Sequence, residues 1–141
     1  KELTSLLKSQ FKADQALLLM GDMNIAAIDN DIGIGEDNKK RWLRDGKTSF
    51  LPEERQWLQD IMAWGLIDSY RALYPDETAG FSWFDYRSRG FEREPRRGLR
   101  IDMILASQPM MDKLSAAGID TEVRSMIKPS DHCPIWAEFQ V

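Results

Sequence analysis

Residues 100–106 have the sequence RIDMILA, in which apolar side chains occupy alternate positions. In an extended strand, side chains two residues apart share a face. One face therefore carries Ile101, Met103 and Leu105, and the other carries Arg100, Asp102 and Ile104. This pattern predicts a strand with one fully apolar face and a carboxylate in the middle of the other.

The segments on either side predict a mixture of helices and strands. The run ALLLM (16–20), closed by Gly21 and Asp22, predicts a strand buried on both faces. Pro52 begins a helix with two glutamates in its first turn and Gly65 at its end. Helices are predicted over 3–12, 39–44, 52–65, 67–73 and 109–117, and further strands over 81–86, 121–126 and 134–139. About five strands and four or five helices in mixed order indicate an α/β or α+β fold.

The composition is that of one globular domain, with 141 residues, 43% hydrophobic and 30% charged. No apolar stretch approaches the roughly 20 residues of a membrane span, and no signal peptide is visible, so we expect a cytoplasmic protein with no membrane partner. The single cysteine, Cys133, excludes an internal disulfide. With a single histidine, His132, it also excludes a tetrahedral Cys/His zinc site.

Positive charge is concentrated in one segment. The net charge is −4, but residues 87–100 contain six arginines and two glutamates, so this segment carries +4 and the rest carries −8. An arginine-rich loop on an acidic body is a candidate contact for phosphate groups of a nucleic acid. The alternative is an ordinary solvated loop.

Three other motifs do not meet the requirements of known sites. Gly46-Lys47-Thr48 lacks the earlier glycine and the apolar strand of a phosphate-binding loop, because position 41 is Arg. Residues 33–35 (GIG) lack the third glycine of a dinucleotide-binding turn. His132 and Cys133 are neighbours that point to opposite sides of an extended chain, so we interpret Cys133 as a packed small hydrophobe.

Polar residues at strand ends remain as candidates for a site. They are Asp22, Asn24, Asp102, Asp131 and His132. Taken singly, most could be turn residues, caps or a partly buried histidine. Asp102 is different, because a carboxylate buried without a partner within a strand costs several kcal/mol. His132, as the sole histidine, is its candidate partner.

Convergence of these carboxylates would call for a cation, because like charges about 4 Å apart repel by roughly 4 kcal/mol at an effective dielectric of 20. Carboxylate and amide oxygens without thiolates favour hard ions such as Mg²⁺, Mn²⁺ or Ca²⁺. A hard ion, an imidazolium and an arginine loop together indicate hydrolysis of a phosphate ester.

Four motifs resemble the C-terminal half of the exonuclease III family of DNA-repair nucleases, within the endonuclease/exonuclease/phosphatase superfamily. They are GDMN (21–24), FSWFDYRS (81–88), GLRIDMILAS (98–107) and SDHCPIWAEF (130–139). The resemblance implies that residues 1–141 form half of a four-layer α/β sandwich, with one mixed, mostly antiparallel sheet flanked by helices. The N-terminal half would supply a further asparagine, a metal-holding glutamate and a catalytic tyrosine.

The resemblance also implies roles for individual residues. Asp22 would activate the attacking water, and Asn24 would orient it. Asp102 would hold His132 protonated, so that His132 donates to a phosphoryl oxygen. The implied ligands of Mg²⁺ (or Mn²⁺) are Asp22, Asn24 and Asp131. The alternative role of Asp131 is that of a base that lies beside the metal ligands without binding the metal. The implied substrate contacts are an abasic-sugar pocket formed by Trp83, Leu99 and Ile101, for which plain core packing is the alternative, and Arg87 on a backbone phosphate.

The implied activity is metal-dependent removal of nucleotides from 3′ ends of double-stranded DNA and cleavage at abasic sites. One alternative is a superfamily phosphatase that acts on lipid or inositol phosphates. Another is a non-catalytic half-domain that self-associates. Because half a sandwich exposes an inner sheet face, we expect the chain to pair with its N-terminal half or with itself, and to be inactive or weak alone.

Overall fold

The computed structural model describes residues 2–140. Its helices are α1 (Glu2–Gln10), α2 (Glu36–Arg44), α3 (Pro52–Gly65), α4 (Ser69–Leu73), α5 (Gln108–Met111) and α6 (Thr121–Arg124), with 3-10 turns at η1 (Asp29–Asp31) and η2 (Gly90–Glu92). Its strands are β1 (Leu18–Asp22), β2 (Leu66–Asp68), β3 (Asp102–Ser107), β4 (Leu114–Ile119) and β5 (Ile135–Phe139). The chain therefore combines helices with short strands in mixed order, as the sequence predicts.

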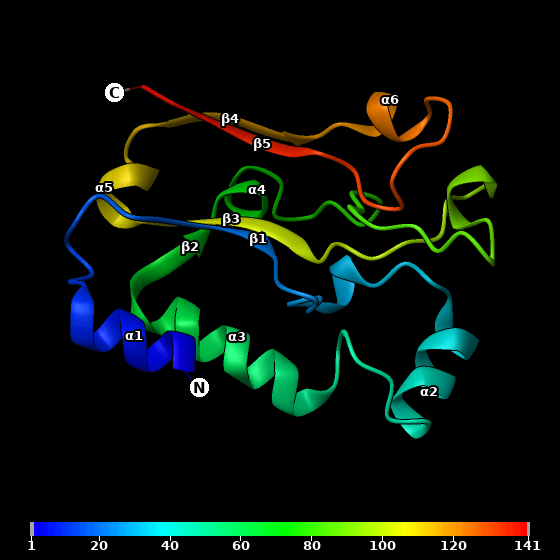
Figure 1. Ribbon diagram of the computed structural model, residues 1–141, viewed down its shortest axis with the longest axis horizontal. Helices are drawn as coiled ribbons and strands as arrows, with labels where there is room; N and C mark the ends of the chain where they lie inside the picture. Colours follow the sequence, from blue (N-terminus) through cyan, green and yellow to red (C-terminus); the bar gives the residue numbers. More distant parts are fainter. Residues whose placement is uncertain (1, 141) are drawn as a thin grey trace.

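The strands form two antiparallel sheets. One sheet has the order β1-β3-β2, and the other is the pair β4-β5. In Figure 1, α1 and α3 lie below the three-stranded sheet and the β4-β5 pair lies above it. The expected class of helices flanking antiparallel strands is confirmed, whereas the single expected sheet is divided in two, with β1 at an edge. No helix in the described part of the chain is long and apolar enough to cross a membrane.

The main core lies between the three-stranded sheet and helices α1 and α3. Ile101, Met103 and Leu105 are at most 3% exposed, which confirms the apolar face predicted from their alternation. Met103 and Leu105 pack in one cluster with residues of both helices, including Leu7 and Leu58. Burial of such side chains stabilises the fold by about 25 cal/mol per Å² of apolar surface.

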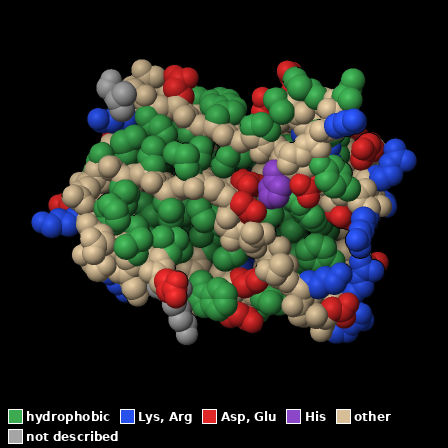
Figure 2. All heavy atoms as spheres, in the orientation of Figure 1, with side chains coloured by type: hydrophobic (Ala, Val, Ile, Leu, Met, Phe, Trp, Pro, Cys, Tyr) green, Lys and Arg blue, Asp and Glu red, His purple; other side chains and the backbone are tan. Residues whose placement is uncertain are grey.

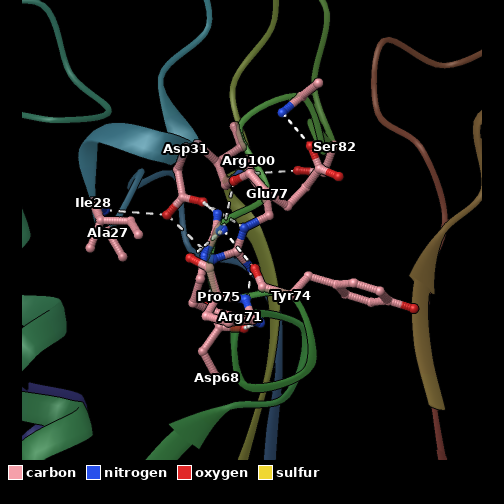
Figure 3. Close-up of polar contacts among 12 residues, drawn as sticks. Ala27, Ile28, Asp31, Asp68, Arg71, Tyr74, Pro75, Glu77, Ser82 and Arg100 are labelled. Carbon is pink, nitrogen blue, oxygen red and sulfur yellow. Dashed lines mark hydrogen bonds and ion pairs between the residues drawn. The ribbon is translucent and has the colours of Figure 1, made fainter.

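A buried ionic network fixes the start of β3 (Figure 3). The Arg100 guanidinium contacts Asp31 Oδ1 at 2.7 Å and Asp68 Oδ2 at 2.5 Å, and Arg71 contacts the same Asp31 oxygen at 2.5 Å. Burial lowers the pKa of Arg100, but the Asp68 and Asp31 carboxylates outweigh it and raise the pKa above its usual value. The network joins η1, the end of β2 and α4 to the residue that lies two positions before Asp102.

Several predicted elements are confirmed with shifted ends. The helices expected over 3–12, 39–44 and 52–65 correspond to α1, α2 and α3, and the last strand corresponds to β5. The strand expected at 16–20 is β1, two residues further along. Its expected burial on both faces is wrong, because β1 is an edge strand and Met20 is 61% exposed.

Four other assignments are wrong in whole or in part. Residues 81–86 form no strand. Within them, only Trp83 pairs with other backbone segments, through isolated bridges to Leu99 and His132. Residues 67 and 68 lie in β2, which pairs with β3, so the helix expected over 67–73 begins only at Ser69. The helix expected over 109–117 ends at Met111, and β4 follows. Residues 121–124 are helical, because the Asp120 side chain caps that turn by accepting from Val123 N.

Candidate active site

The candidate site is built on the antiparallel pairing of β1 with β3. Asp22, the last residue of β1, is directly opposite Asp102, the first residue of β3. Directly opposed residues of antiparallel strands place their side chains on the same face, and like charges in this arrangement are destabilising. The strand register therefore brings together two carboxylates that need a positive partner.

His132 is the side chain that the structure places against both carboxylates. Its Nδ1 is 2.9 Å from Asp102 Oδ2, and its Nε2 is 4.0 Å from Asp22 Oδ2. Because an ionised carboxylate only accepts hydrogen bonds, the Nδ1–H group donates to Asp102 and Nε2 faces Asp22. Figure 2 shows the histidine at the surface with acidic side chains beside it. The ring is 31% exposed, so a substrate can reach it.

Ser82 holds the backbone of Asp102 in place. The buried Ser82 hydroxyl accepts from the backbone N–H groups of Ile101 and Asp102, both at 3.0 Å. These two N–H groups would otherwise be unsatisfied near the start of the strand, at a cost of about 1–3 kcal/mol each. Ser82 lies in the FSWFDYRS motif, but the sequence analysis did not identify it as part of the site.

Asn24 follows Asp22 in a tight turn. The Asp22 Oδ1 atom accepts from Asn24 N at 2.8 Å, and Asn24 has a φ of 52°. Asparagine tolerates this left-handed conformation better than most residues. The turn places the Asn24 side chain in the wall of a pocket beside His132.

This pocket, which we call the site pocket, has a volume of about 400 Å³. The residues that line it are Asn24, Trp42, Lys47, Thr48, Ser49, Trp83, Ile101 and His132. Of the three residues expected to receive an abasic sugar, Trp83 and Ile101 line the pocket. Leu99 does not, because it is fully buried in the core behind them.

Two other expected site residues lie outside this group. The Asp131 side chain is absent from the cluster of Asp22, Asp102 and His132, whose ligand atoms lie within 4.8 Å of one another in the described chain. Instead, Asp131 Oδ2 accepts from the Trp83 indole N–H at 3.0 Å. Arg87 is exposed on the arginine-rich loop. Among residues 2–140, it lines neither the site pocket nor a smaller pocket next to it that Trp42 and Trp83 also line.

One wall of the site pocket was not predicted from the sequence. Lys47 lies over the Trp42 ring at 5.4 Å, and Ser49 has a φ of 106°, which is unusual for a residue with a side chain. Buried Glu54 holds this wall, because it accepts from Thr48 Oγ1 at 2.5 Å and from Ser49 N at 2.9 Å. A tryptophan in the charged segment before Gly46 is the signal that could have revealed this wall.

The donor set at the strand ends fits a hard divalent cation. Asp22 and Asp102 offer carboxylate oxygens, and their combined charge of −2 exceeds the +1 that a protonated His132 supplies. Oxygen donors without thiolates select Mg²⁺ or Mn²⁺ over softer metals. Cys133 is not a competing ligand, since it is buried and its burial raises the pKa of the thiol to about 11.

Comparisons with known proteins find relatives over nearly the whole chain. A family model described as the endonuclease/exonuclease/phosphatase family matches residues 1–132. The chain is 53% identical over 139 residues to exodeoxyribonuclease III of Haemophilus influenzae, covering 99% of this chain and 51% of that protein. It is 29% identical over 119 residues to the exodeoxyribonuclease of Bacillus subtilis, covering 84% of this chain and 42% of that protein.

Solved structures show the same fold. An AP endonuclease from Archaeoglobus fulgidus superposes with a TM-score of 0.86 at 28% identity. A 3′ phosphatase from Neisseria bound to a product DNA hairpin superposes with a TM-score of 0.82 at 35% identity. Each comparison covers 99% of this chain and 51% of the other. The chain thus spans about half the length of the curated relatives and structures that it resembles.

Proposed function

The chain belongs to the endonuclease/exonuclease/phosphatase family, and on this premise we propose that it forms the C-terminal half of a DNA-repair nuclease of the exonuclease III type. Its reaction is hydrolysis of a phosphodiester bond at 3′ ends or abasic sites of double-stranded DNA. The observation that carries the proposal is the arrangement of His132 between Asp22 and Asp102 at the mouth of a pocket.

In this proposal, the two ring nitrogens of His132 have different roles. Asp102 accepts from Nδ1–H, which fixes the orientation of the ring. Nε2 then donates to a phosphoryl oxygen, where negative charge grows as water attacks phosphorus. Asp22 takes a proton from that water, and Asn24 holds the water by a hydrogen bond from its side-chain amide. As the new bond to phosphorus forms, the bond from phosphorus to the leaving oxygen breaks, and the leaving oxygen takes a proton from solvent.

A divalent cation, Mg²⁺ or Mn²⁺, would be held by the Asp22 carboxylate and the Asn24 amide oxygen, with further ligands from the N-terminal half. When bound, it stabilises charge on the phosphoryl oxygens. We propose that Asp131 acts through Trp83, which it orients by accepting the indole N–H. Its expected role as a metal ligand is not favoured by this contact.

The site pocket favours DNA over a lipid or inositol phosphate. Its walls contain two indoles and Ile101 next to the polar groups at His132, which suits a sugar with no base attached. Arg100 is buried and paired with Asp31 and Asp68, so it cannot contact DNA. The other five arginines and two glutamates of residues 87–100 leave a charge of +3 beyond the pocket for the rest of a polyanion. Cleavage of abasic duplex DNA, compared with release of phosphate from a phosphoinositide, tests this choice directly.

We propose further that an N-terminal half of the family domain covers the exposed edges of the two sheets. Met20 on β1 and Trp136 on β5 are 61% and 47% exposed. Figure 2 shows hydrophobic side chains over much of the face that carries these strands. Large exposed apolar patches mark interfaces, and the chain spans about half of its relatives. The alternative is self-association of a non-catalytic half-domain through the same face.

One comparison separates these possibilities. We expect strong Mg²⁺-dependent cleavage of abasic duplex DNA by the complete domain, meaning this chain joined to its N-terminal half, and weak or absent cleavage by the 141-residue chain. A complete domain that is inert on DNA would refute the nuclease proposal. A cytoplasmic location remains part of the proposal, because the enzyme must reach the DNA that it repairs.

A further inference from the structure

A second pocket of about 100 Å³ adjoins the site pocket, and both are lined by Trp42 and Trp83. The two indole rings are 6.4 Å apart between centroids, so they form a common wall. Beyond this wall lie three arginines from two separate segments: Arg41 of α2, and Arg93 and Arg97 of the loop before β3. We call this second pocket the arginine pocket. Figure 2 shows blue side chains along the edge of the molecule where these segments lie.

The three guanidinium groups are not neutralised by carboxylates. Among residues 2–140, none of them forms an ion pair within 4.0 Å. Arg41 donates to the Asn38 side-chain oxygen at 2.8 Å, and Arg93 donates to the Ser88 carbonyl at 3.0 Å. Both acceptors are uncharged, and most N–H groups of the two side chains remain free to bind a ligand.

The backbone leaves room for the third arginine. Gly35, at the start of α2, has a φ of 88°, and a Cβ atom added there would lie 3.4 Å from Arg97 Nη1. The Arg97 guanidinium therefore lies directly against the Gly35 backbone. This contact brings the loop and α2 together around the arginine pocket.

Asp85 is the one carboxylate among the lining residues of the arginine pocket. Burial raises its pKa, but hydrogen bonds from Ser88 and Arg87, together with the charge of Arg87, outweigh burial and lower the pKa below its usual value. Its charge is thus engaged by the Ser88 backbone N–H at 2.9 Å. Three arginines and one aspartate leave a local charge of +2, which suits an anion.

We propose that the arginine pocket binds a backbone phosphate of the substrate strand, at a position other than the phosphate that is cleaved. The inference rests on the proposed nuclease function for the identity of the strand. Planar guanidinium groups bind phosphate oxygens through paired hydrogen bonds, and three arginines line this pocket. The strand would run from His132, across the indoles of Trp42 and Trp83, into the arginine pocket.

The position of Trp83 supports this path. Its backbone bridges to both His132 and Leu99, and its indole lines both pockets. A phosphate in the arginine pocket therefore lies on the same rigid unit as the imidazole. The pocket would set which phosphodiester along the strand reaches His132, in addition to adding affinity.

The test is DNA binding by the complete domain without metal, measured against salt concentration for three variants: Arg41→Gln, Arg93→Gln and Arg97→Gln. Each should weaken binding roughly tenfold and reduce the slope of log affinity against log salt by about 0.9. Arg44→Gln is the matched control, because Arg44 is an exposed arginine of the same helix that is already paired with Asp45. It should leave both quantities unchanged.

A second variant gives an effect in the opposite direction. Asp85→Asn removes the negative charge but keeps an oxygen that accepts from Ser88 N, so it should tighten DNA binding. A duplex carrying one neutral methylphosphonate tests position. Substitution at the phosphate bound by the pocket should weaken binding of the parent protein but have little further effect on Arg97→Gln.

The outcomes are distinguishable. Equal loss in Arg44→Gln and the three pocket variants, or the same methylphosphonate profile in Arg97→Gln and the parent, would overturn the proposal. Competition by inorganic phosphate as strong as that by DNA, at constant ionic strength, would assign the pocket to a free anion instead. Because these measurements need no cleavage, they are independent of whether the nuclease proposal survives.

Discussion

Asp22 and Asp102 face each other across the β1-β3 pair, and the imidazole of His132 lies within 4.0 Å of both carboxylates. Two like charges at directly opposed positions are unfavourable in a sheet used only for packing. Their presence beside a shared imidazole indicates a site whose geometry follows from strand register. The following predictions test what that geometry does.

Asp102→Asn should reduce kcat of the complete domain on abasic duplex DNA by about 10²–10⁴, because the imidazolium loses its charged partner. The substituted side chain is close in shape, so the free energy of unfolding should change much less than activity. Asp14→Asn, at an exposed position, is the control for loss of one negative charge. Equal kcat values for Asp102→Asn and the parent would remove His132 from the proposed mechanism.

Ser82→Ala should lower the free energy of unfolding by about 2–6 kcal/mol, because it leaves two backbone N–H groups without an acceptor. Activity should fall as well, since Asp102 loses its anchor. Urea unfolding measures the first effect, and steady-state kinetics the second. Ser9→Ala, on exposed α1, should stay within about 0.5 kcal/mol of the parent; a similar small value for Ser82→Ala would contradict the anchoring role.

Asp31→Ala should destabilise the fold by about 3–5 kcal/mol, because it leaves Arg100 buried with only part of its compensating charge. Arg100 is 1% exposed, so water cannot replace the lost carboxylate. Asp29→Ala provides the contrast. Its carboxylate pairs with Arg55 and Lys39 and has a pKa lowered by those contacts, but it is largely exposed. Equal losses of stability in the two variants would show that burial of the network is not what makes it strong.

Cys133 should react slowly with iodoacetamide at pH 8, because burial holds its pKa near 11 and keeps the thiol neutral. The raised pKa also sets a pH dependence. Stability linked to the neutral thiol is fully present below pH 9.0, the unfolded value, and is lost as pH rises towards 11. Cys133→Ala should lack this loss. Fast alkylation of the folded protein at pH 8 would contradict the burial.

The sequence predicted the elements whose apolar spacing is unambiguous. The alternation in residues 100–106 gave the face of β3 correctly, and Pro52 marked the start of α3. The proximity of Asp102 and His132 was also expected, because a carboxylate within an apolar strand needs a partner. Sequence reasoning failed at residues 121–124, where alternating Thr and Val favour a strand but the Asp120 cap and tertiary contacts favour a helix turn.

The parts of the site that were not predicted depend on hydrogen bonds between residues far apart in the sequence. Ser82 reaches the backbone of Asp102 across 20 residues, and nothing in its local sequence indicates this. Trp42 lies in the helix predicted over 39–44 and Lys47 in the charged segment after it, and neither position carries a local motif that indicates a pocket. Asp131, expected among the metal ligands, instead accepts from Trp83, because its neighbour His132 takes the position facing Asp102.

The buried ionic network has a consequence for how the strands find their partners. Arg100 and Asp102 lie two residues apart, so a slip of one residue would turn both towards the opposite face of the sheet. The guanidinium would then lose Asp31 and Asp68 and lie among apolar groups, while Met103 would move to the place opposite Asp22. A slipped pairing of β3 is therefore destabilised, because it leaves the Arg100 guanidinium buried without a carboxylate. The register that keeps Arg100 paired is also the register that places Asp102 beside His132.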